Sequence, residues 1–470
     1  MIENGLKYYD SRTATKEEFL EDLSEVMMPD DISGNNMAGG PILFREGKKL
    51  YVDNNDSHTL FIGNTSSMKT LRFVLPLIYS SAMAEESMII VDPKGELVRK
   101  TNLFLKQKGY NISILNWRNP RLSPNGWDPM ERINRMYKQG GAYREEAIND
   151  LNDLLNELFF QRSDASKDIY WNESAGRLGL GLCKLILALG EDLSIKTLLE
   201  WKSGKLKDGT VRSYFDALPA DDDIYQNLSG FMNLSAENTK SCIESTFDQL
   251  MGLFSSSKDL CKMMSRNCID IENVGIGKNA VFLVIPDEKT TYHFLASLYI
   301  KQSYEILLRK AEEYEGKLPV RVNYIMEEFC NMPKVNDLTA MLTAARSRNI
   351  RFYLVIQSYS QMVDKYGEHV SKTIMDNCGN LIYLHTNELS FLKYISNLAG
   401  KNEYGRPLLS VSRLQHLQKN ETLIFHERCY PFMVKDLPLI FEYPIILGND
   451  IPVLKDEDED RCELKKPILK

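Results

Sequence analysis

Gly63-Asn-Thr-Ser-Ser-Met-Lys69-Thr70 has the spacing of the phosphate-binding loop G-x-x-x-x-G-K-[ST], with methionine in place of the second glycine. The loop follows an apolar, strand-like run at residues 59–62 and precedes a helix-like run from residue 70 to about residue 83. This strand–loop–helix order predicts that backbone N–H groups and the helix N-terminus hold phosphate oxygens.

Individual side chains of this loop have expected roles. Lys69 is expected to reach the β- and γ-phosphates of a nucleotide, and the Thr70 hydroxyl is expected to bind Mg²⁺. A side chain at Met68 either crowds the path of the phosphates or imposes an unfavourable backbone geometry. The predicted nucleotide-binding residues are Gly63, Asn64, Thr65, Ser66, Ser67, Met68, Lys69 and Thr70.

The bulk composition limits the class of protein. With 470 residues, 43% apolar and 26% charged, the chain has room for two or three globular domains. A net charge of −8 argues against a protein that coats nucleic acid with its whole surface, although a narrow basic channel is compatible with it. The eight cysteines form no C-x-x-C pair, which favours reduced thiols over a zinc site.

The pattern of elements predicts an α/β fold with an inserted helical domain. Apolar strands alternate with helices after residue 57, stop near residue 130 and resume near residue 280, which is typical of a parallel sheet. We therefore expect a lead-in at residues 1–56, a discontinuous nucleotide-binding domain at residues 57–130 and 271–450, an all-α domain at residues 131–270 and an acidic tail at residues 451–470. No signal peptide and no apolar run of about 18–20 residues is present, so the sequence predicts a soluble chain.

A second chemical motif lies far downstream of the loop. The apolar strand at residues 322–326 ends in Glu327 and Glu328. In P-loop ATPases a carboxylate at such a strand end helps to hold Mg²⁺. The usual residue is aspartate, and the longer Glu327 moves the carboxylate outward from a metal that demands tight octahedral geometry. On this motif alone, a buried strand that ends in a solvated acidic turn remains an alternative.

Two further polar residues suit phosphoryl transfer. Gln357 follows the next apolar strand and could contact the γ-phosphate or the attacking water. Arg346 precedes that strand and could act as a finger that enters the site of a neighbouring subunit. Taken singly, each residue is better explained as an ordinary loop glutamine or as a basic helix end.

Many segments, in this order along most of the chain, resemble the TraG/TraD-like coupling ATPases of conjugative and type IV secretion systems. Besides the loop, they are Asp92-Pro-Lys-Gly-Glu96, residues 115–120, Trp127-Asp-Pro129, residues 169–171 with 175–185, residues 280–287 with 291–293, Glu327-Glu-Phe-Cys-Asn-Met-Pro333, Arg346-Ser-Arg348, Ile356-Gln-Ser358, Asp376-Asn-Cys378 and Lys393-Tyr-Ile-Ser396. The glutamate-rich segment is similar to the family's Asp-Glu-Phe-(Ala/Gly)-Asn.

The resemblance implies a RecA-like nucleotide-binding domain with an inserted all-α domain, and hexamers with sites between subunits. It implies ATP and Mg²⁺ as cofactors, with Thr70 and Glu327 at the metal. It further implies Glu328 as the catalytic carboxylate, Arg346 as the trans finger and Gln357 as the γ-phosphate sensor. The implied partners are a relaxase or relaxosome, single-stranded DNA and inner-membrane components of the secretion system. The implied location is the inner face of a bacterial cell membrane.

Three departures from the family pattern leave a second function open. Met68 replaces glycine, Glu327 replaces aspartate, and no membrane anchor precedes the ATPase segments. The first hypothesis is an ATP-hydrolysing coupling protein that passes relaxase-bound DNA or a protein effector to the membrane channel. The alternative is a weak or inactive ATPase fold that serves as a docking platform. An unrelated α/β protein with coincidental motifs is a third hypothesis, disfavoured by the ordered match.

Overall fold

The computed structural model describes residues 11–33, 37–160 and 169–453. Within these residues the chain forms two compact units, one of residues 11–118 with 270–452 and one of residues 119–269. The acidic run Asp456–Asp460 and the first ten residues of the predicted lead-in lie outside the described residues.

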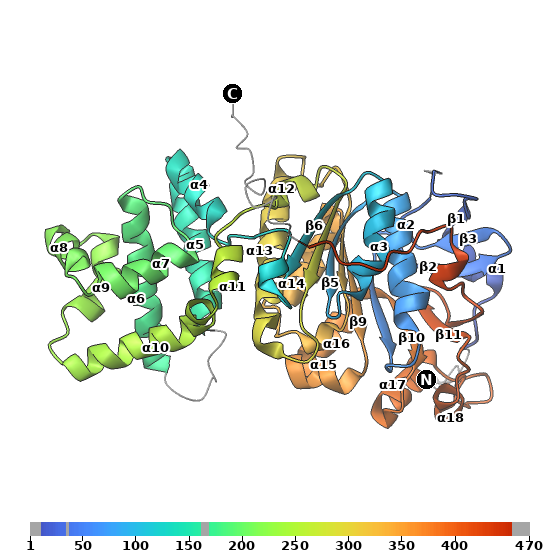
Figure 1. Ribbon diagram of the computed structural model, residues 1–470. Helices are drawn as coiled ribbons and strands as arrows, with labels where there is room; N and C mark the ends of the chain where they lie inside the picture. The colour runs from blue at the N-terminus through green and yellow to red at the C-terminus, as the bar shows by residue number, and fades with distance from the viewer. Residues whose placement is uncertain (1–10, 34–36, 161–168, 454–470) are drawn as a thin grey trace. The chain divides into compact units, whose positions relative to one another are not determined.

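The first unit is built on a twisted sheet that has nine strands in the described part of the chain (Figure 1). The spatial order is β12-β11-β10-β4-β9-β8-β5-β7-β6. These strands are β4 (His58–Gly63), β5 (Ser87–Asp92), β6 (Asn111–Asn116), β7 (Asn279–Val284), β8 (Val322–Met326), β9 (Ile350–Ile356), β10 (Cys378–His385), β11 (Glu421–His426) and β12 (Phe432–Lys435).

The seven strands from β10 to β6 run parallel to one another. Strand β11 pairs antiparallel with β10, and β12 pairs antiparallel with β11. Strands β4, β5, β7, β8 and β9 are buried along their whole length, which explains their near-continuous apolar sequences. The parallel direction brings the carboxyl ends of all seven strands to one edge of the sheet.

Helices cover both faces of this sheet. The helices of the unit are α1 (Lys16–Leu20), α2 (Leu75–Met83), α3 (Glu96–Gln107), α12 (Ile271–Val274), α13 (His293–Glu312), α14 (Leu338–Ala345), α15 (Tyr359–Tyr366), α16 (Glu368–Asp376), α17 (Leu389–Ala399) and α18 (Val411–Gln415). A π-helical turn spans Thr70–Val74, and 3₁₀ turns span Thr290–Tyr292, Phe329–Asn331, Arg346–Arg348 and Ile440–Glu442.

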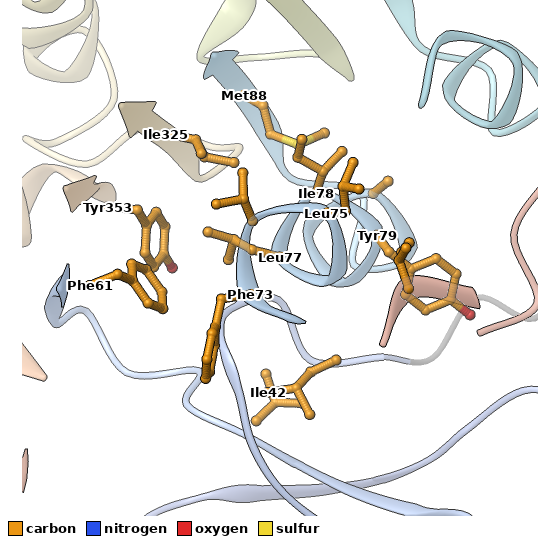
Figure 2. Close-up of a cluster of buried hydrophobic side chains, with 14 of the residues drawn as sticks. Ile42, Phe61, Phe73, Leu75, Leu77, Ile78, Tyr79, Met88, Ile325 and Tyr353 are labelled. Carbon is orange, nitrogen blue, oxygen red and sulfur yellow. The ribbon is translucent and has the colours of Figure 1, made fainter. Parts of the chain in front are cut away.

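The helix that follows the phosphate loop packs on one sheet face. Figure 2 shows Leu75, Leu77 and Ile78 of this segment beside side chains of the strands. Phe73 contacts Phe61 of β4, with the ring centroids 5.3 Å apart. On the other face, Tyr304 of α13 contacts Phe352 of β9 at 6.1 Å. The loop therefore begins and ends in buried, rigid elements.

A small antiparallel sheet of order β1-β3-β2 belongs to the same unit in the described residues. Its strands are β1 (Ser24–Met27), β2 (Ile42–Glu46) and β3 (Lys49–Val52). Strands β2 and β3 pair as a hairpin, and a capping box of Thr15 and Glu18 starts α1. Strands β1 and β12 were not predicted, because each is only four residues long and half-exposed.

The secondary-structure elements in the described residues of the second unit are all helical. Its helices are α4 (Glu131–Gln139), α5 (Ala142–Phe160), α6 (Ile169–Ala188), α7 (Ile195–Glu200), α8 (Thr210–Ala217), α9 (Asp223–Met232), α10 (Glu237–Ser256) and α11 (Lys258–Met263), with a 3₁₀ turn at Pro120–Leu122 and a π-helical turn at Trp201–Lys205. The buried Trp201 begins that π-helical turn.

No helix among the described residues combines the length and the apolar character needed to cross a bilayer.

His58 makes the start of β4 sensitive to acid. The ring is fully buried, its Nε2 donates to the carbonyl oxygen of Leu342 at 2.7 Å, and its Nδ1 accepts from the Phe352 N–H at 3.0 Å. The neutral ring satisfies both partners. Burial accordingly lowers the pKa of His58 to about 4, despite the opposing effect of the bond to Leu342.

The folded pKa of His58 lies below its unfolded value. The part of the folding stability that depends on the neutral ring is therefore complete above pH ~6.5 and is lost as the pH falls toward 4. We expect His58→Gln to reduce the acid-induced loss of unfolding free energy by roughly 2–3 kcal/mol. Urea unfolding at pH 7 and pH 4.5 measures this, with the exposed His369→Gln as the matched control. An equal acid sensitivity in wild type and His58→Gln would contradict the assignment.

Candidate nucleotide-binding site

The predicted site residues, with the exception of Arg346, converge at the carboxyl edge of the large sheet. Strand β9 lies between β4 and β8, so the phosphate loop, Gln357 and Glu327 follow three adjacent strands. In the register of β8 with β5, Met326 pairs with Val91. Glu327 and Asp92 are therefore the next residues on neighbouring strands. The sequence motifs are separated by up to about 290 residues, and the sheet order brings them together.

The phosphate loop leaves β4 in a tight turn. The Ser67 N–H and hydroxyl both donate to the Asn64 carbonyl oxygen, at 3.1 and 2.7 Å. A Cβ at Gly63 would lie 2.5 Å from the Ser67 Oγ, so only glycine fits there. Within the described residues, the N–H groups of Thr65, Ser66 and Met68 have no protein acceptor. Such exposed N–H groups suit the phosphate oxygens of a nucleotide.

Met68 adopts the left-handed backbone conformation, with φ of 62°. For a residue with a Cβ this conformation costs about 1–2 kcal/mol, whereas glycine adopts it freely. Of the two effects expected from methionine at this position, the unfavourable backbone geometry is therefore present. The loop keeps the shape that a glycine would give it.

The Lys69 side chain contacts the backbone of the phosphate loop. Its ammonium group donates to the carbonyl oxygens of Gly63 and, at 2.9 Å, of Asn64. Burial lowers the pKa of Lys69 to about 8, and the nearby carboxylates of Glu327 and Glu328 oppose this shift. The hydrogen bonds of this half-buried cation go to neutral carbonyl oxygens, so an anion at the loop would stabilise it.

Thr70 and Glu327 form the candidate metal site. The Thr70 hydroxyl donates to Oε1 of Glu327 at 2.6 Å, so the longer glutamate side chain still reaches the loop. Two oxygen ligands from protein suit Mg²⁺, which takes its remaining ligands from phosphate and water. The residues present therefore fit the metal.

The acidic groups of this site are partly deprived of solvent. Burial raises the pKa of Glu327 to about 7; the bond from Thr70 opposes the shift, and Asp92 and Glu328 add to it. Burial likewise raises the pKa of Asp92 to about 6, although its Oδ2 accepts from the Val98 N–H at 2.9 Å. The Asp92 Oδ1 is buried without a hydrogen-bond partner. Nearby cations would lower the free-energy cost of ionising both carboxyl groups.

Glu328 is held by donors from three segments. Its backbone is left-handed, with φ of 51°. The Asn331 amide donates to Oε2 at 2.7 Å, and the Gln357 amide lies 3.4 Å from Oε1. The Lys94 ammonium lies 3.8 Å from the same Oε1. Gln357 in turn accepts from the Thr65 hydroxyl at 3.2 Å, which joins the carboxylate to the phosphate loop.

Arg346 is the predicted residue that the structure does not bring to this edge. It lies in the 3₁₀ turn before β9, 3.4 Å from Glu427. Gln357 follows the other end of β9, and seven residues of strand separate the two by about 23 Å. Within one chain, Arg346 therefore cannot reach a nucleotide at the loop.

Sequence reasoning assigned no role at this site to Lys94, Asp92 or Asn331. The Lys94 ammonium lies 3.8 Å from Glu328. The available signal was the position of Asp92 and Lys94 directly after an apolar strand, where the residues of a parallel sheet face ligands. Asn331 belongs to the quoted glutamate motif, but only the fold reveals its contact with Glu328.

The family comparison covers most of the chain. The family model described as "Type IV secretory system Conjugative DNA transfer" matches residues 13–429. The "Conjugal transfer protein TraG" of Rhizobium radiobacter is 19% identical over 389 residues, which cover 79% of this chain and 58% of that protein. The TraG of Agrobacterium fabrum (strain C58 / ATCC 33970) is 19% identical over 401 residues, with 78% and 58% covered. The chain thus spans less than two thirds of these relatives.

Solved structures with the same fold include the bacterial conjugative coupling protein TrwBdeltaN70 in its unbound monoclinic form. It has a TM-score of 0.64 and 15% identity, and the match covers 97% of this chain and 100% of that chain. TrwB in complex with ADPNP gives a TM-score of 0.62 at 14% identity, with 95% and 99% covered. These likenesses confirm the predicted RecA-like α/β fold with an all-α domain. By its family match, the chain belongs to the conjugative DNA transfer family of type IV secretory systems.

Proposed function

We propose that this protein is a coupling ATPase of a conjugative or type IV secretion system. It hydrolyses ATP with Mg²⁺ and uses the energy to pass a relaxase–DNA complex or a protein effector toward the membrane channel. The observation that carries the proposal is the convergence of Lys69, Thr70, Glu327, Glu328 and Gln357 on one sheet edge, where Thr70 donates to Glu327 and Gln357 contacts Glu328. A docking platform has no physical need for this complete set.

The chemistry follows from what each group can do. The loop N–H groups and Lys69 would hold the phosphate charge, and the oxygens of Thr70 and Glu327 would hold Mg²⁺, which would supply neutralisation of the phosphate charge. Glu328 accepts a proton from the attacking water, which Gln357 orients. Support for these cofactors comes from TrwB, whose structures include complexes with ADPNP and with ADP and Mg²⁺.

The proposed assembly is a hexameric ring with head-to-tail interfaces. Such an interface joins two different faces of the subunit. Arg346 lies at the sheet edge opposite to the loop, so an arginine finger would have to act on the site of a neighbouring subunit. The proposed partners are a relaxase, single-stranded DNA and inner-membrane components of the secretion system, and the proposed place of action is the inner face of the membrane.

The first test is steady-state ATP hydrolysis with Mg²⁺, with and without single-stranded DNA. We expect turnover that rises with DNA and disappears in Lys69→Ala, because this variant loses the cation at the loop. Glu328→Gln should lower kcat by about 10²–10⁴-fold while it still binds nucleotide. Wild-type activity no higher than that of Lys69→Ala would refute the ATPase and favour the docking platform.

Subunit mixing tests the trans role of Arg346. Arg346→Ala and Lys69→Ala should each be inactive alone. For Arg346→Ala we expect the rate of ATP hydrolysis to fall by at least about 100-fold. In an equal mixture, about a quarter of the head-to-tail interfaces combine an intact Lys69 with an intact Arg346. We therefore expect about a quarter of the wild-type rate. A mixture as inactive as its parts would refute the trans role, and an active Arg346→Ala protein would place Arg346 outside the reaction.

Met68→Gly tests whether methionine limits turnover. We expect at least a several-fold rise in kcat/KM for ATP, because glycine removes a side chain from beside the path of the phosphates. Glu85→Gly is the matched control, since Glu85 is exposed and has the same left-handed backbone at the end of α2. Unchanged kinetics in Met68→Gly would mean that the loop accommodates methionine without loss.

A further inference from the structure

Asn331 contacts Glu328 twice and is itself anchored. It closes the 3₁₀ turn that follows Glu328, with its N–H donating to the Glu328 carbonyl oxygen at 2.7 Å. Its side-chain amide donates to Oε2 of Glu328, also at 2.7 Å. Its own carbonyl oxygen lies 3.0 Å from Nδ1 of His293. The residue therefore connects the carboxylate to a side chain of a different element.

His293 supplies a rigid anchor for this turn. Only 1% of the residue is exposed, and it is the first residue of α13. Its second ring nitrogen, Nε2, contacts the carbonyl oxygen of Pro286 in the segment after β7. The ring is thus fixed between the β7 segment and the turn of Asn331. A turn fixed in this way holds the left-handed backbone of Glu328 in place.

The two carboxylate oxygens of Glu328 are not equivalent. Oε2 accepts a short bond from the Asn331 amide, whereas Oε1 has only the longer contacts of 3.4 Å to Gln357 and 3.8 Å to Lys94. The short bond fixes the rotamer of the side chain and occupies one oxygen. The oxygen that remains available lies on the side of Gln357, which contacts the phosphate loop through Thr65.

We infer that Asn331 is a positioning residue for Glu328. It holds Oε2, so that Oε1 faces the attacking water and receives its proton. This inference rests on the proposed function, because a proton acceptor matters only where ATP is hydrolysed. The backbone N–H of Asn331 would by itself close the turn, so the directed amide of its side chain is the feature that a purely structural role leaves unexplained.

Kinetics separate positioning from a general structural effect. We expect Asn331→Ala to lower kcat by about 10–100-fold with less than about a twofold change in KM, because small misplacements of a reacting group cost this much. Asn331→Asp keeps the size and the backbone contacts but removes the donor, so it should lose at least as much. Asn420→Ala is the matched control, since the exposed Asn420 also donates to a carboxylate, that of Asp436, at 2.9 Å.

A double-variant cycle then tests whether Asn331 acts through Glu328. In the Glu328→Gln background, Asn331→Ala should cause no further loss, because the group that it positions is already gone. Equal losses in both backgrounds would overturn the inference. So would an unchanged kcat in both Asn331 variants, or an effect on KM alone.

Crystal structures of the wild type and of Asn331→Asp give a readout that does not depend on turnover. We expect the Glu328 carboxylate to move by about 1 Å or more in the variant, whose overall fold should be unchanged. A carboxylate that keeps its position without the Asn331 donor would overturn the inference. A wild type that shows no hydrolysis would refute the proposed function, while the position of Glu328 in the two crystals would still decide the role of Asn331.

Discussion

The parallel pairing of β4 with β9 and β10 is the constraint on which the site depends. In this register Ile62 of β4 lies beside Ile356 of β9, so the phosphate loop and Gln357 begin at the same level of the sheet. On the other side, Gly63 lies beside His385 of β10, whose ring contacts Asn64 at 2.9 Å. A shift of either strand by one residue would turn its side chains to the opposite face and disperse these contacts.

Burial raises the free-energy cost of keeping the ionisable groups of this site charged. Burial is the main cause of the lowered pKa of Lys69 and of the raised pKa values of Glu327 and Asp92. The charged forms are therefore destabilised at both the loop and the carboxylates. Phosphate would compensate the positive charge of Lys69, and a divalent cation would compensate the negative charges of the carboxylates. Burial of these groups therefore favours binding of a metal–nucleotide complex.

Met68 and Glu328 show backbone strain at two points of the same site. Both residues carry side chains in the left-handed region, one in the phosphate loop and one directly after β8. Strain of this kind persists where the surroundings hold the chain in place. Around Glu328 the surroundings are Asn331 and the buried His293. Around Met68 they are the turn closed by Ser67 and the π-helical segment that begins at Thr70.

Local patterns in the chain were sufficient to predict the phosphate loop, the strands that lead to Gln357 and Glu327, and the helical character of the described residues between 131 and 270. Alternating apolar runs and the loop spacing act over a few residues, and the parallel sheet follows from their order. The left-handed conformation of Met68, the reach of Glu327 to Thr70 and the contact of Asn331 with Glu328 depended on the folded chain. So did the distance of Arg346 from the loop. These features arise from strand register and packing between segments far apart in sequence, and no local pattern of residues contains that information.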